Sequence, residues 1–180
     1  MSENKWLVIV YNLPSEPSKL RVRAWRNLKK LGAINISQSM WILPYNEKNH
    51  STLLTLSEEL ENDNGETFIM KTAFMEDKYE KRIISYFNAA RKIEYEEIID
   101  KCEDYFNEIE KETERKNFTF AEAEENEEEL EKLLAWFLKI KNRDIYNSEL
   151  RKPTEEALEK CKHVFEEFST RVYEIESTNT

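Results

Sequence analysis

The first 75 residues alternate between short apolar runs and polar segments. Runs such as WLVIVY are rich in β-branched and aromatic residues, as half-buried or buried strands are. Between the first run and the next two lies a segment with helical spacing, in which apolar residues recur three and four positions apart. Strands are predicted at 6–11, 33–37, 40–43 and 67–74, with helices at 19–31 and after Asn46. This β-α-β-β-α-β order is that of the ferredoxin-like split unit.

Local signals mark where these helices begin and end. Ser18 is predicted to cap the first helix, because its hydroxyl can accept a hydrogen bond from a free amide of the first turn. Gly32 follows the helix as a C-terminal stop would. Asn46 is predicted to cap the second helix in the same way as Ser18.

From residue 76 onward the strand signals disappear and apolar residues recur every three or four positions. Three amphipathic helices joined by short polar segments should pack as an antiparallel bundle. The sequence therefore predicts an α+β protein, with a ferredoxin-like βαββαβ module at 1–75 and a three-helix antiparallel bundle at 76–176. Residues 177–180 are expected to be disordered.

Charge is distributed unevenly along the chain. The formal net charge is −10, yet residues 1–31 contain 7 Lys and Arg against 2 Asp and Glu. An anionic partner should therefore meet the N-terminal third. With no signal-peptide pattern, no long apolar run and only two distant cysteines, we expect a soluble cytoplasmic protein without a disulfide framework.

The basic charge of the first helix forms stripes beside its apolar side. We single out Arg21, Arg23, Arg26 and Lys30 as candidates for binding DNA or another anion. A solvated outer helix face would show the same pattern, so both interpretations remain open.

Arg91 is unusual because it falls within an otherwise apolar helical seam. A buried guanidinium needs a carboxylate or a bound anion, and we favour an internal salt bridge with Glu94 or Asp144. The alternative is an oxyanion pocket made by Arg91, Tyr95, Arg143 and an arginine of the first helix. A dianion such as chromate or sulfate would suit these donors.

Catalytic and metal chemistry have little support in the sequence. Cys102 and Cys161 fall on apolar stripes and are expected to be small core residues, and with His163 they are too few for a structural zinc site. No nucleophile and base occur at a usable spacing. We expect no metal, no cofactor and no enzymatic activity.

Several segments together resemble a known family. WLVIVYNLPSEPSKLRVRAWRNLKKLGA followed by QSMWILP, and later FNAARKIEY, NRDIY and RVY, are similar to the N-terminal domain of the chromate-resistance regulator ChrB. The resemblance implies transcriptional regulation or oxyanion sensing. Larger members of that family carry a further C-terminal domain, and the similar segments all belong to the N-terminal domain.

The first 75 residues also resemble the module of the repressor PaaX and of small CRISPR-associated ferredoxin-like nucleases. In those nucleases an aspartate ends the first strand and is associated with metal, whereas Asn12 occupies that position here. A neutral amide is a poor ligand for Mg²⁺, which disfavours the alternative of a metal-dependent nuclease. Relatives of the module pair through their sheets, so the resemblance implies a homodimer. A third hypothesis is a protein-interaction module that uses the acidic bundle.

Overall fold

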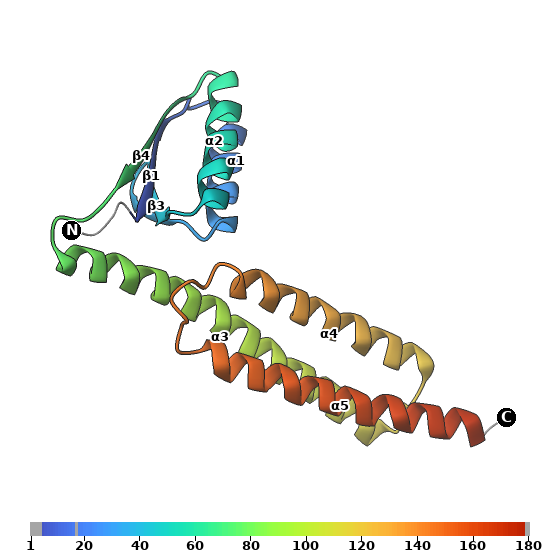
Figure 1. Cartoon of the computed structure of the whole chain (residues 1–180). Helices are drawn as coiled ribbons and strands as arrows, with labels where there is room; N and C mark the ends of the chain where they lie inside the picture. The colour runs from blue at the N-terminus through green and yellow to red at the C-terminus, as the bar shows by residue number, and fades with distance from the viewer. Residues whose placement is uncertain (1–4, 17, 179–180) are drawn as a thin grey trace. The chain divides into compact units, whose positions relative to one another are not determined.

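The computed structural model describes residues 5–16 and 18–178, which form two compact units divided between Phe87 and Asn88. Figure 1 shows the elements in chain order. They are β1 (Trp6–Asn12), α1 (Lys19–Lys30), β2 (Ile34–Ser37), β3 (Met40–Pro44), α2 (Glu47–Asn62), β4 (Glu66–Thr72), α3 (Asp77–Arg115), α4 (Phe120–Lys141) and α5 (Arg151–Thr178).

The first unit contains a four-stranded antiparallel sheet in the order β2-β3-β1-β4. In the central strand, Ile9 lies opposite Trp41 of β3 and Ile69 of β4. Strands β1 and β2 run parallel with β3 between them, which is the split β-α-β arrangement. The ferredoxin-like α+β class predicted from the sequence is confirmed.

Helices α1 and α2 lie on the same face of this sheet (Figure 1). Their apolar stripes are buried, as the three-four spacing requires. The buried residues are Leu20, Ala24 and Leu28 from α1 and Leu53, Leu56 and Leu60 from α2. Trp6 of β1 packs against Phe74 and Phe87, so the first turns of α3 contribute to this unit.

The helix caps divide into one wrong prediction and two confirmed ones. Ser18 makes no side-chain cap, because its backbone is already helical (φ −59°, ψ −18°). Asn46 has the extended backbone that a cap needs, and its side chain accepts a hydrogen bond from the Asn49 amide at 2.7 Å. Gly32 has a φ of 78°, the left-handed conformation that ends α1.

The second unit is built from α4, α5 and most of α3, and its core is a single apolar cluster. Helices that follow one another in the chain run in opposite directions, so α3 and α5 run in the same direction (Figure 1). Helix α5 continues through Thr178, two residues into the segment for which the sequence predicts disorder, and residues 179–180 lie outside the described range. Among the described helices, none is both long and apolar enough to cross a lipid bilayer.

Candidate functional site

Helix α1 exposes a mixed basic and apolar surface on the side away from the sheet. Trp25 is 48% exposed and Val22 is 42% exposed, although both are large apolar side chains. The exposed cations Arg26 and Lys29 share this outer side with them. On such a surface the cations can contact phosphates and the aromatic side chain can contact bases.

Two of the predicted arginines are held by groups of the protein itself. Arg21 donates from Nη2 to the Ser15 carbonyl at 2.8 Å. Arg23 forms an ion pair with Asp63, and its Nη2 lies 3.5 Å from the Glu59 carbonyl oxygen. Asp63 is 40 residues away in sequence, in the turn after α2, so helical spacing could not reveal this pairing.

Arg26 and Lys30 are exposed, and neither has an ion pair or a side-chain hydrogen bond within the described residues. They are four residues apart, so they lie one turn from each other on the same side of α1. Of the four predicted α1 cations, these two are therefore the ones that can take a phosphate without breaking an internal contact.

The second predicted group lies within the helical unit, around Arg91. The Arg91 side chain is only 4% exposed, and its Nε lies 2.7 Å from Glu94 Oε2, although the N–H is not directed at that oxygen. Arg91 Nη1 also donates to the Arg143 carbonyl at 3.4 Å. Burial lowers the pKa of Arg91, while the Glu94 carboxylate raises it and the neighbouring Arg143 lowers it.

Glu94 is shared between two arginines. Arg143 donates to Glu94 through both Nε and Nη2, the first at 3.3 Å, in a fork-shaped contact. The internal salt bridge predicted for Arg91 is thus present with Glu94. The sequence missed that Arg143 would bind the same carboxylate, because Arg143 is 49 positions from Glu94 and no periodic signal links the two.

Asp144, the other partner predicted for Arg91, forms hydrogen bonds with other residues. Its Oδ2 accepts a hydrogen bond from the Tyr95 hydroxyl at 3.0 Å, and its Oδ1 accepts one from the Ser148 amide, also at 3.0 Å. Burial and this bond to Asp144 raise the pKa of Tyr95. The structure therefore brings Arg91, Tyr95 and Arg143 together, with two carboxylates that balance the two guanidinium charges.

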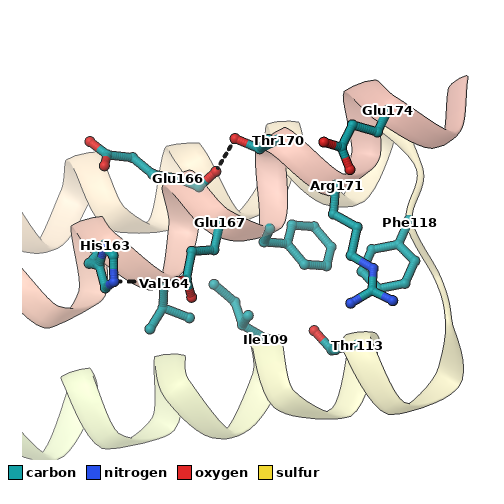
Figure 2. Close-up of a pocket in the computed structure, with 11 residues that line it drawn as sticks. Ile109, Thr113, Phe118, His163, Val164, Glu166, Glu167, Thr170, Arg171 and Glu174 are labelled. Atoms are coloured by element: carbon teal, nitrogen blue, oxygen red, sulfur yellow. Dashed lines mark hydrogen bonds and ion pairs between the residues drawn. The ribbon is translucent and has the colours of Figure 1, made fainter. Parts of the chain in front are cut away.

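A groove of about 720 Å³ lies between the C-terminal part of α3 and α5 (Figure 2). Its floor is apolar, with Ile109, Phe118 and Phe168 all buried. The Arg171 guanidinium lies 4.8 Å from the centre of the Phe118 ring, while three glutamates on α5 contribute to the lining. This acidic rim suits a basic partner better than an oxyanion.

The cysteines are core residues, as the apolar stripes predict. Cys102 and Cys161 are both fully buried, and Cys161 Sγ lies 4.0 Å from the Cys102 carbonyl oxygen. His163 is separate from them on the surface, where Nε2 lies 3.3 Å from Glu167 Oε1. Within the described residues, no three His, Cys, Asp or Glu side chains are grouped to hold a metal ion.

Comparison with known proteins gives one family and one relative. Residues 21–179 match the family described as "Protein ChrB, N-terminal". The chain is 30% identical to "Protein ChrB" of Cupriavidus metallidurans over 95 residues, which is 53% of this chain. The match spans 29% of that relative's length, so less than a third of it is represented. No solved structure matches the chain.

Proposed function

Because this chain belongs to the family of the ChrB N-terminal domain, we propose that it is a chromate-resistance-type regulator that binds DNA through α1. The observation that carries the proposal is the exposed outer surface of α1, where Arg26 and Lys30 are unpaired within the described residues and Trp25 is half exposed. Phosphate contacts from such cations position a protein on DNA, and a neighbouring aromatic side chain can contact bases.

Salt dependence of DNA binding tests this proposal. Each phosphate contact contributes about 0.9 to the slope of log affinity against log salt on duplex DNA. Arg26→Ala/Lys30→Ala should therefore weaken binding and flatten the slope by about 1.8. Fluorescence anisotropy on a labelled duplex, repeated at several salt concentrations, measures both quantities.

Lys139→Ala/Lys160→Ala is the matched control. It removes the same charge from exposed lysines of α4 and α5 that have no ion pair within the described residues. The control should keep the wild-type slope. Equal slopes for wild type, control and Arg26→Ala/Lys30→Ala would remove α1 as the DNA-binding surface.

A specific observation supports oxyanion sensing as a second candidate activity. Arg91 and Arg143 converge on the single carboxylate of Glu94, whereas Asp144 is held separately by Tyr95 and Ser148. A tetrahedral dianion of the chromate class could replace the Glu94 carboxylate and accept hydrogen bonds from both guanidinium groups.

Calorimetry with sulfate and molybdate, which do not oxidise the protein, tests this candidate. Glu94→Gln removes the competing charge and should bind either anion more tightly than wild type does. Arg143→Gln should bind more weakly, and chloride at equal ionic strength should give no heat of binding. Identical, weak heats for all three proteins would contradict an anion site here.

The groove in Figure 2 is the place where the alternative of a protein-interaction module would find its partner. A partner bound there should be retained equally well by wild type and by Arg26→Ala/Lys30→Ala. If the partner is retained only when DNA is present, and Arg26→Ala/Lys30→Ala no longer retains it, the result would instead support the regulator.

A further inference from the structure

The sheet of the first unit ends at a long edge strand, β4, whose outer edge has no partner strand within the described residues. Strand β4 pairs with β1 along seven residues. Every second residue of an edge strand directs its N–H and C=O groups away from the sheet. Proteins usually blunt such edges with proline, a bulge or an inward-pointing charge. Strand β4 has no proline and no irregularity in its pairing with β1, and its one charge on the helix-covered face is Lys71, near the end of the strand.

The side chains of β4 are also incompletely covered. Phe68 is 57% exposed and Met70 is 44% exposed, and both project from the sheet face opposite α1 and α2, the face shared by Val8 and Val10. Ile69, on the helix-covered face, is only half buried. Two large apolar side chains exposed side by side, on an edge that no described strand pairs with, are a surface suited to contacts with a further strand.

Two-fold symmetry restricts how β4 could pair with a copy of itself. In an antiparallel pair about an axis normal to the sheet, residues on the same face must lie opposite each other. The full overlap of Glu66–Thr72 centres on Ile69, which then meets its own copy. In this register Phe68 lies opposite Met70 of the second copy, and the same apolar pair forms twice.

Charges on the helix-covered face fit the same register. Thr67 would lie opposite Lys71 of the second copy. The Thr67 hydroxyl donates to the carboxylate of Glu61 on α2, so this register places a negative charge near that lysine, whose Nζ lies 3.6 Å from the centre of the Tyr45 ring in its own copy. The edge is therefore complementary to itself in both apolar side chains and charge.

We propose that two copies of this chain join through the outer edges of β4, in antiparallel register about Ile69, so that their two sheets form one continuous sheet. This inference goes beyond the proposed function, because it names a surface through which two copies associate. It does not depend on which surface binds DNA.

Analytical ultracentrifugation of the full chain tests the proposal. Wild type should sediment as a dimer. Phe68→Lys/Met70→Lys places like charges opposite each other twice and should weaken association about a hundredfold. Phe68→Glu/Met70→Lys places opposite charges at the same two positions and should restore the dimer, which a general loss of folding could not explain.

Ile93→Lys is the control, because Ile93 on α3 is 65% exposed and its replacement should leave the dimer intact. A dimeric Phe68→Lys/Met70→Lys, or a monomeric Phe68→Glu/Met70→Lys with wild-type circular dichroism, would overturn the register. A monomeric wild type that still binds DNA through α1 would overturn this inference and leave the proposed function standing. A wild-type dimer that binds no DNA would leave this inference standing and contradict the proposed function.

Discussion

Replacing Glu94 by alanine should destabilise the helical unit more than the loss of one ion pair suggests. The Arg91 side chain is 4% exposed, so without Glu94 its charge is left in the protein interior with one weak bond to the Arg143 carbonyl at 3.4 Å. Breaking a buried pair from one side costs about 3–5 kcal/mol. Glu94 is 26% exposed and water can enter in its place, so we expect a loss of about 2–4 kcal/mol.

Urea denaturation followed by circular dichroism measures this loss. With a slope of about 2 kcal/mol per molar urea, the unfolding midpoint of Glu94→Ala should fall by about 1–2 M. Glu149→Ala is the matched control on a solvated pair, since its partner Lys92 is 48% exposed, and it should cost less than about 1 kcal/mol.

A double variant separates the buried charge from the lost contact. Arg91→Leu/Glu94→Ala removes the uncompensated guanidinium as well as its partner, so it should be more stable than Glu94→Ala alone. The reasoning would be refuted if the double variant lost as much free energy of unfolding as the two single variants lose together. Arg91 would then act through packing or hydrogen bonding and not as a buried charge.

Three further outcomes follow from individual contacts. Burial raises the pKa of Tyr95 and Tyr105 above the usual 10, so above about pH 10 the folded state keeps protons that the unfolded chain releases. The free energy of unfolding, measured by urea denaturation at several pH values, should therefore fall above about pH 10. It should fall less steeply in Tyr95→Phe. Asn46→Ala should cost about 1 kcal/mol in the same assay, whereas Ser18→Ala should cost almost nothing, because only the asparagine caps its helix. Gly65→Ala should lower the thermal midpoint clearly, since a Cβ there would lie 2.7 Å from the Leu60 carbonyl oxygen; an unchanged midpoint would contradict that clash.

The fold was predictable because its signals are local. Period-two and period-3.6 patterns indicate strands and helices directly, and the order of the elements then limits the topology. Ser18 shows where such reasoning fails. Its residue type suits a cap, but the side-chain bond depends on a backbone conformation that the residue type does not determine.

The candidate site was predictable only in part, because its contacts join distant segments. The apolar seam around Arg91 correctly indicated a buried charge with Glu94 as a partner. That Arg143 would bind the same carboxylate, and that Arg23 would be held by Asp63, depends on tertiary packing. No spacing in the sequence reports such contacts.

Selection of bound duplexes from a random-sequence DNA library tests the central claim most directly. A regulator that reads DNA through α1 should enrich a defined sequence, and a two-fold symmetric dimer should make that sequence a palindrome. Arg26→Ala/Lys30→Ala should lose the enrichment, while Lys139→Ala/Lys160→Ala keeps it. No enriched sequence with wild type, or equal enrichment with the α1 variant, would contradict DNA recognition by this helix.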